Sequence, residues 1–237
     1  LNPYYYYYYN NTGNGIHVAS SNDVVVDDNN VYNSIRHGIF ASYSDDLEVT
    51  DNTVDYSGQG YYYYYGYTYG EGIRIENSDW ATIDNNDVSR SSQNGIMVYY
   101  SDYADVSGNT LWHNGHGPSG YNWWWGSGVY VNGSRFAEVS GNDIDDSGYN
   151  GIYAYSSNGL VIDSNDINDS NYDGIYVGNA YGSTGYNEDQ DIWPEYNVRI
   201  TGNTIDESGY HGIETYEVQR LLIADNEIDD SGSYNYS

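Results

Sequence analysis

Two consecutive stretches decide the fold: GVYVNGSRFAEVSGNDIDDSGYN at residues 128–150 and GIYAYSSNGLVIDSNDINDSNYD at residues 151–173. Written one above the other, they place glycine over glycine, asparagine over asparagine and aliphatic over aliphatic side chains. Self-similarity at a fixed period of this length is the signature of a repeat architecture. Each unit of such an architecture buries its apolar side against the units before and after it.

The same unit recurs along nearly the whole chain. Each copy starts with a Gly-Ile or Gly-Val pair, and an Asn-x-aliphatic marker follows at a fixed offset in all copies but the seventh. The basic period is 23 residues, with insertions near 59–69, 116–126 and 181–195. The glycines are Gly15, Gly38, Gly72, Gly95, Gly128, Gly151, Gly174 and Gly212, and the asparagines are Asn29, Asn52, Asn86, Asn109, Asn142, Asn165, Asn203 and Asn226.

Within each copy the apolar residues alternate in short runs. In the fifth copy, Val129 and Val131 are followed by Ala137 and Val139 and then by Ile144. Alternation with a period of two marks strands that bury one face, and runs this short cannot be helices. The sequence therefore predicts an all-β chain with three short strands in each unit.

The polar markers predict how the units stack. Paired strands lie ~4.8 Å apart, so the marker asparagines of successive units would form a column in which side-chain amides hydrogen-bond to one another. Serine forms a second column at Ser34, Ser57, Ser91, Ser147, Ser170, Ser208 and Ser231. We interpret both columns as structural.

On the Gly-Ile starts and Asn-x-Ile markers between residues 15 and 231, the chain resembles the right-handed parallel β-helix proteins of the pectate-lyase-like superfamily. The resemblance implies a single-stranded right-handed parallel β-helix, one domain over residues 1–237, with about eight to nine coils of 23 residues and three loop insertions. That superfamily includes polysaccharide lyases, hydrolases and epimerases as well as adhesins and fibre proteins, so the resemblance does not choose among activities.

Composition narrows the classes of partner. The 35 acidic residues outnumber the 6 basic ones, which gives a net charge of -29. Such a charge disfavours nucleic acid and anionic membrane surfaces, and no apolar run approaches the ~20 residues of a membrane helix. The absence of cysteine excludes disulfides and thiolate chemistry. Together with the resemblance, which implies a carbohydrate partner, we expect an extracellular or cell-surface protein whose partners are polysaccharides or attached glycans.

Tyrosines recur at the outward positions of the first strand in successive units. Because rings with a polar tip suit contact with sugars or with another protein, this stripe is the predicted glycan-binding face. Cross-strand packing of a solvated face is the alternative, and the sequence leaves both open. The predicted face consists of Tyr99, Tyr130, Tyr153, Tyr155, Tyr176 and Tyr216.

The third unit carries the candidate catalytic residues Glu71, Arg74 and Glu76, between the first two insertions. In a glycoside hydrolase, one carboxylic acid protonates the leaving oxygen while the other carboxylate activates water or attacks. In a lyase, a base would remove the proton next to a uronate carboxylate that arginine or calcium holds. The alternative is ordinary ion pairing on an exposed strand.

Acidic residues follow the third strand of several units and would form two columns at one edge of the stack. Like charges ~5 Å apart repel each other, and oxygen ligands suit calcium, so calcium is the candidate cofactor. A solvated acidic flank is the alternative. The candidate metal ligands are Asp145, Asp146, Asp169, Asp206, Glu207, Asp229 and Asp230, whereas His116 is interpreted as a loop residue.

Four Asn-x-Ser/Thr sequons are candidate glycosylation sites in a chain secreted by a glycosylating organism: Asn10, Asn132, Asn168 and Asn235. Glycosylation at Asn132 would compete with a ligand on the tyrosine face.

The sequence favours an extracellular structural or adhesive protein that is carbohydrate-associated. The first and last residues nearly continue one another in repeat phase, which predicts end-to-end self-association as a fibre subunit. One alternative is a polysaccharide lyase, hydrolase or epimerase acting through the third-unit cluster. The other is a calcium-dependent glycan-binding module without chemistry.

Overall fold

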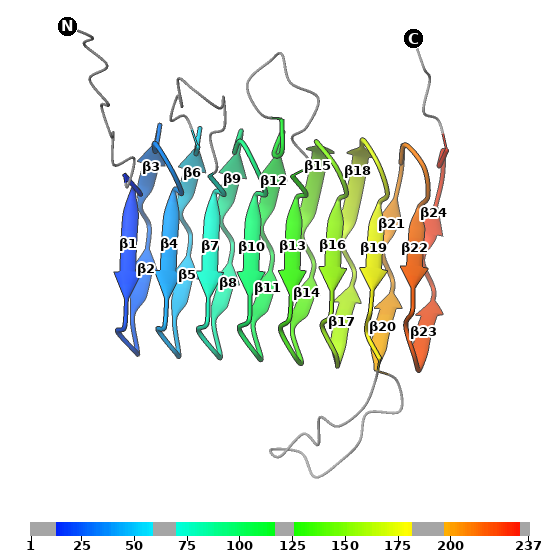
Figure 1. Ribbon diagram of the computed structural model, residues 1–237. Helices are drawn as coiled ribbons and strands as arrows, with labels where there is room; N and C mark the ends of the chain where they lie inside the picture. The colour runs from blue at the N-terminus through cyan, green and yellow to red at the C-terminus, as the bar shows by residue number, and fades with distance from the viewer. Residues whose placement is uncertain (1–12, 59–69, 117–125, 182–196, 233–237) are drawn as a thin grey trace, which may run out of the picture.

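The computed structural model describes residues 13–58, 70–116, 126–181 and 197–232. In this part of the chain every coil contributes one strand to each of three parallel sheets (Figure 1). Sheet A consists of β1 (Ile16–Ala19), β4 (Ile39–Ser42), β7 (Ile73–Glu76), β10 (Ile96–Tyr99), β13 (Val129–Asn132), β16 (Ile152–Tyr155), β19 (Ile175–Gly178) and β22 (Ile213–Tyr216).

The second and third strands of the coils form the other two sheets. Sheet B consists of β2 (Val25–Asp27), β5 (Glu48–Thr50), β8 (Thr82–Asp84), β11 (Asp105–Ser107), β14 (Glu138–Ser140), β17 (Leu160–Asp163), β20 (Val198–Thr201) and β23 (Leu221–Ala224). Sheet C consists of β3 (Asn30–Tyr32), β6 (Thr53–Asp55), β9 (Asp87–Ser89), β12 (Thr110–Trp112), β15 (Asp143–Ser147), β18 (Asp166–Ser170), β21 (Thr204–Ile205) and β24 (Glu227–Ile228).

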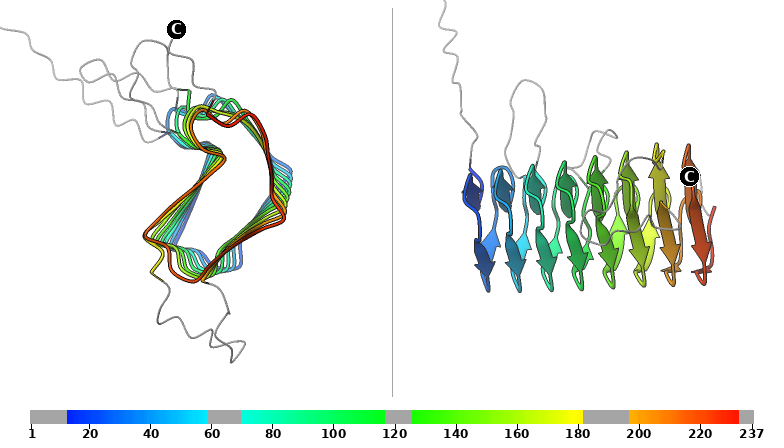
Figure 2. Two further views of the ribbon diagram at one scale, coloured as in Figure 1. Left: turned by 90° about the vertical axis from the view of Figure 1, so that its right-hand side faces the viewer. Right: turned by 90° about the horizontal axis from the view of Figure 1, so that it is seen from below.

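The pairing register follows the sequence repeat. Ile73 pairs with Ile96, and Val129 pairs with Ile152, so the residue after each marker glycine lies beside its counterpart in the next coil. Viewed along the axis, the coils superpose (Figure 2). The predicted winding and the predicted parallel β-helix are therefore confirmed.

The core is the narrow interior between the three sheets. Alternate side chains of each strand point inward, and the central coils contribute fully buried residues from every sheet, for example Ile152, Ile162 and Ile167. In each strand, an inward aliphatic side chain lies beside another aliphatic side chain one coil away, as Val131 lies beside Ala154. Burial of small aliphatic groups is therefore repeated along the axis.

The marker asparagines form the predicted column. The Nδ2 atom of Asn52 donates to Oδ1 of Asn86 at 3.0 Å, and Asn86 repeats this contact to Asn109 at 2.9 Å. The backbone N–H of each asparagine donates to the same oxygen of the next. Within the described chain, the ladder runs from Asn29 to Asn226.

The corner before each ladder asparagine uses the left-handed backbone region. Asp51 and Asn85 have φ of 55°, and Gly108 and Gly141 hold the same position with φ of 63° and 62°. Aspartate, asparagine and glycine tolerate this region best, which explains the polar residues before the marker.

The part of the chain that the structure describes contains no helix long and apolar enough to cross a membrane.

Candidate functional site

The outward face of sheet A carries a stack of tyrosine rings. Tyr130, Tyr153 and Tyr176 lie at matching positions of β13, β16 and β19. Neighbouring ring centroids are 5.2 and 4.9 Å apart, and the ring planes differ by 8° and 9°. Near-parallel rings this close cover one another's faces. The cross-strand packing that the sequence left open is thus present, and the stripe presents ring edges and hydroxyls to solvent.

Two tyrosines of this stripe, Tyr153 and Tyr176, have a raised pKa. Burial, followed by the neighbouring phenols Tyr130 and Tyr176, raises the pKa of Tyr153 above its ordinary value. Burial also raises the pKa of Tyr176, and the nearby Glu214 adds to the effect. Tyr153 and Tyr176 therefore offer neutral phenol hydroxyls that can donate hydrogen bonds, and successive coils place such hydroxyls about 4.8 Å apart along the axis.

The second predicted row of tyrosines does not form a continuous stack. Tyr99 and Tyr155 each pair with Asn132, and Tyr155 and Tyr216 each pair with Gly178, so a small or polar residue separates the rings. A Cβ atom at Gly178 would lie 2.9 Å from Cε1 and the hydroxyl oxygen of the Tyr176 ring. The Tyr176 ring of the stripe thus occupies the space beside Gly178 where a side chain would lie.

A group of three titratable residues lies at one end of the tyrosine stripe. Nδ1 of His211 is 2.9 Å from Oδ1 of Asp173 and 3.5 Å from Oε2 of Glu214. Asp173 is buried, whereas the His211 side chain is 57% exposed. Glu214 follows Tyr176 in the outward row of sheet A.

The environment of Asp173 favours its protonated form. Burial raises the pKa of Asp173 to about 6, and Glu214 adds to this effect, although the hydrogen bond from His211 opposes it. The second carboxyl oxygen, Oδ2, is buried and has no hydrogen-bond partner among the described residues. A carboxyl group whose pKa lies close to the working pH, joined to an exposed imidazole, is an arrangement suited to proton transfer.

No candidate group was predicted at Asp173, His211 and Glu214. The sequence contains the signal, because Asp173 and His211 precede the marker glycines of consecutive coils and Glu214 takes the first outward position. Alignment of the coils brings these positions together.

The predicted catalytic residues Glu71, Arg74 and Glu76 do lie together, as an ion-pair network. Arg74 contacts Glu71 through Nη1 at 3.4 Å and Glu76 through Nη2 at 3.0 Å. Oε2 of Glu71 is also 2.5 Å from Nδ1 of His37, and these two side chains are only 3% and 2% exposed.

Glu71 is ionised in this network. Burial opposes its ionisation, but the hydrogen bond and charge of His37 and the charge of Arg74 outweigh burial and lower the pKa of Glu71. A buried, paired carboxylate is a poor proton donor. The network differs from the exposed strand considered in the sequence analysis, because Glu71, which precedes the marker glycine Gly72, is buried beside His37. Catalysis at Glu71, Arg74 and Glu76 stays a prediction.

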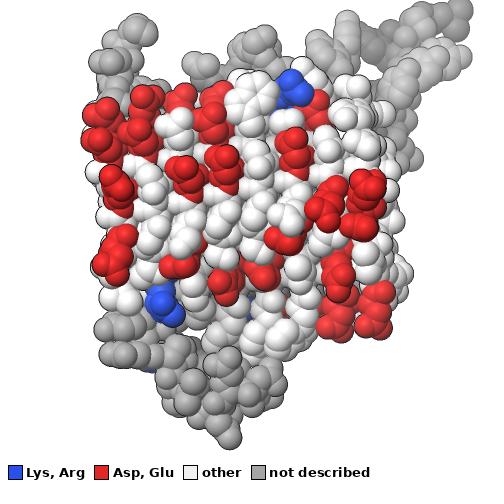
Figure 3. Space-filling view, turned by 180° about the vertical axis from the view of Figure 1, so that it is seen from behind, with Lys and Arg blue, Asp and Glu red and all other residues white. Residues whose placement is uncertain are grey.

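The predicted acidic columns form at the edge of sheet C. Asp145 pairs with Asn168, which donates to its Oδ1 at 3.0 Å. Burial, then the charges of Asp146 and Asp145, raises the pKa of Asp169. The remaining members, Asp206, Glu207, Asp229 and Asp230, are half-buried or exposed. Carboxylates also cover the side of the molecule opposite sheet A (Figure 3). Calcium binding here stays a prediction.

Two of the four sequons lie in the described chain. The Asn132 amide donates to the hydroxyl of Tyr130 at 2.8 Å, within the tyrosine face, and Asn168 is exposed. Asn10 and Asn235 lie outside the described residues, as do most residues of the three insertions.

Solved structures share this architecture. The periplasmic alginate epimerase AlgG is 16% identical, with a TM-score of 0.62 over 90% of this chain and 47% of the epimerase. The catalytic domain of a GH87 α-1,3-glucanase in complex with nigerose is 12% identical, with a TM-score of 0.53 over 93% of this chain and 47% of that domain. The chain thus spans about half the length of the structures it matches, and likeness at this identity shows the fold.

No curated protein matches the sequence. The family described as "Right handed beta helix region" matches residues 6–111 and 127–237. Since these matches cover most of the sequence and agree with the three parallel sheets, the chain belongs to the right-handed β-helix family.

Proposed function

We propose that the chain is an extracellular or cell-surface β-helix protein that binds a polysaccharide along the tyrosine stripe of sheet A. The observation that supports this proposal is the row of Tyr130, Tyr153 and Tyr176. Stacking fixes these three rings, and their hydroxyls lie at matching positions of three consecutive coils. A polymer lying along the axis would meet an equivalent hydroxyl at each of these three coils. Its binding would cost little side-chain entropy, because stacking already fixes the rings.

The charge of the chain favours a neutral polymer. At a net charge of -29 the protein repels a polyuronate in the absence of a divalent cation. Arg74, on the same face, is already paired with Glu71 and Glu76. The names of the structural neighbours suggest both probes, a neutral α-1,3-glucan and alginate, and we expect the former to bind more tightly.

Removing hydroxyls from the stripe tests this proposal. The double variant Tyr153→Phe/Tyr176→Phe keeps the stacked rings but removes two donors, each worth ~0.5–1.5 kcal/mol, so binding of soluble α-1,3-glucan oligosaccharides should weaken roughly tenfold. Titration calorimetry measures the change. Tyr32→Phe is the matched control, because Tyr32 is exposed on β3 of sheet C. Unchanged affinity in the double variant, or an equal loss in the control, would refute binding at the stripe.

If the protein leaves the bound polymer intact, its role is structural or adhesive. End-to-end association of the chain stays a prediction.

The group Asp173, His211 and Glu214 favours a second candidate function, namely cleavage or epimerisation of the polymer. His211 would exchange a proton with the substrate, buried Asp173 would orient its ring, and Glu214 would be the second carboxylate.

Turnover separates the two functions. If the protein is an enzyme, incubation with α-1,3-glucan or alginate should release reducing ends, form unsaturated uronates or change the uronate epimer ratio. His211→Gln and Glu214→Gln should then lower the rate by ~10²–10⁴-fold. Glu76→Gln should leave it nearly unchanged if the third-coil network is structural. A native protein without turnover would leave the adhesive role, and loss in Glu76→Gln alone would move catalysis to the third coil.

A further inference from the structure

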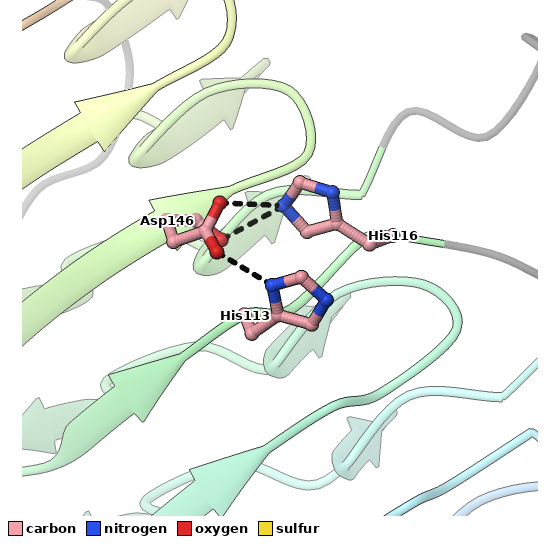
Figure 4. Close-up of side chains that lie close together, drawn as sticks. All are labelled: His113, His116 and Asp146. Atoms are coloured by element: carbon pink, nitrogen blue, oxygen red, sulfur yellow. Dashed lines mark hydrogen bonds and ion pairs between the residues drawn. The ribbon is translucent and has the colours of Figure 1, made fainter.

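A second cluster of ligand-bearing side chains lies at the edge between sheets C and A. It consists of His113, His116 and Asp146, which point toward one another (Figure 4). Nδ1 of His113 is 2.5 Å from Oδ2 of Asp146, and Nε2 of His116 is 2.9 Å from Oδ1 of the same carboxylate. The two imidazole rings are stacked, with centroids 4.2 Å apart and planes 4° apart.

The backbone around the cluster is held by inter-coil hydrogen bonds. His113 N–H donates to Asp145 O at 3.1 Å, and Gly115 N–H donates to Ser91 O at 2.9 Å. Between the two histidines, the buried Asn114 donates its amide to Val88 O at 2.8 Å. The ligand atoms therefore project from a fixed scaffold, as a preorganised site requires.

His113 and Asp146 both have left-handed backbone conformations, and their side chains point toward each other. His113 and Asp146 occupy equivalent corners of consecutive coils, with φ of 54° and 53°. Gly115, with φ of 85°, turns the chain so that His116 returns to the same carboxylate. A Cβ atom at Gly115 would lie only 2.0 Å from the carbonyl oxygen of Gly126. The backbones of Gly115 and Gly126 are therefore in close contact, and a larger residue at position 115 would not fit.

We propose that His113, His116 and Asp146 bind a divalent transition-metal ion, with Zn²⁺ as the expected species. Two neutral imidazoles and one carboxylate match the three-protein-ligand sets of tetrahedral zinc sites, which leave a fourth position for water. Imidazole nitrogen is a poor ligand for calcium, so this site differs in chemistry from the calcium predicted for the acidic columns.

The observed spacing suits the insertion of an ion. The three ligand atoms lie within 4.8 Å of one another, and ligands of tetrahedral zinc are about 3.4 Å apart. Each imidazole now lies at hydrogen-bond distance from the carboxylate, so an ion would replace the shared protons. Because the two rings are nearly parallel, they would turn so that both nitrogens face the ion. All three side chains are partly exposed, which gives the ion and a water ligand access.

Neighbouring charges add to the attraction for a cation. Asp145 precedes Asp146, and Asp169 occupies the corresponding corner of the next coil. Arg90 occupies the corner below His113, but its guanidinium is bound to Asp55. The site therefore faces net negative potential.

The experiment titrates Zn²⁺ and, separately, Ca²⁺ into metal-free full-length protein by calorimetry. We expect one zinc per chain at this site and at least ten- to hundredfold weaker binding in His113→Asn and Asp146→Asn, since even outer-shell changes cost that much. Asparagine tolerates the left-handed corner, as Asn33 shows at the equivalent position of the first coil, so both variants should fold. Circular dichroism verifies this.

Two further measurements locate the ion. His211→Ala disrupts the only other such group found among the described residues, Asp173, His211 and Glu214, and should leave zinc affinity unchanged. Co²⁺ bound in place of zinc should give the intense visible bands of a tetrahedral complex, which His116→Ala should remove. Absence of saturable zinc binding, unchanged affinity in His113→Asn, or loss in His211→Ala alone would overturn the proposal.

Discussion

Replacing Gly151 with alanine should destabilise the protein by about 3 kcal/mol or more, near the upper end of overpacking in close-packed interiors. An added Cβ atom would lie 2.3 Å from Cγ2 of Ile167, 2.7 Å from the carbonyl oxygen of Gly174 and 3.0 Å from Oγ of Ser170. Two of these atoms are core or backbone atoms, so relief requires the coils to move apart. Urea unfolding followed by circular dichroism measures the loss.

Gly141→Ala is the matched control for the Gly151 variant. Gly141 has φ of 62°, yet a Cβ atom there would meet no other atom within 4 Å. This variant should cost only the ~1–2 kcal/mol of a left-handed alanine. Equal losses at the two positions would show that inter-coil contact is not the reason for the glycine column.

The glycine column illustrates what the repeat predicts and what it omits. The spacing of the Gly-Ile pairs predicts the register, because residues one period apart must lie side by side in a stack of coils. The reason for glycine itself needs coordinates, since it depends on the side chain that fills the interior beside it, such as Val88 beside Gly72 and Ile144 beside Gly128. A serine of the second predicted column also lies against most of these glycines.

The sequence predicts the candidate sites less well than the register, because the alternation of apolar and polar residues does not determine where side chains at the corners point. Glu71 and Asp173 precede marker glycines, outside the alternating strand positions, and both are buried. The interpretation of His116 as a loop residue missed its contact with Asp146, which depends on the turn at Gly115. Strand positions such as Tyr130 could be assigned correctly, since alternation fixes which face they occupy.

Replacing Asn109 with alanine should cost about 3 kcal/mol or more, because each buried polar group left without a partner costs ~1–3 kcal/mol. The Asn109 amide donates to Ile83 O, Ser107 O and Asn142 Oδ1, each at 2.9 Å. Its Oδ1 accepts the backbone N–H and the amide of Asn86, both at 2.9 Å. With alanine at position 109, the buried N–H of Asn86 and the buried carbonyl of Ile83 would each lose this hydrogen-bond partner.

Position in the ladder provides the control for Asn109. Asn29 belongs to the same column and donates to Asn52 Oδ1, but its own oxygen receives no ladder bond from the described residues before it. Asn29→Ala should therefore cost clearly less, and the exposed Asn168→Ala should stay within about 0.5 kcal/mol. Urea unfolding of the three variants orders the losses. If Asn29→Ala and Asn109→Ala lost the same stability, the loss would come from the asparagine corner itself, and hydrogen bonding between coils could not be its source.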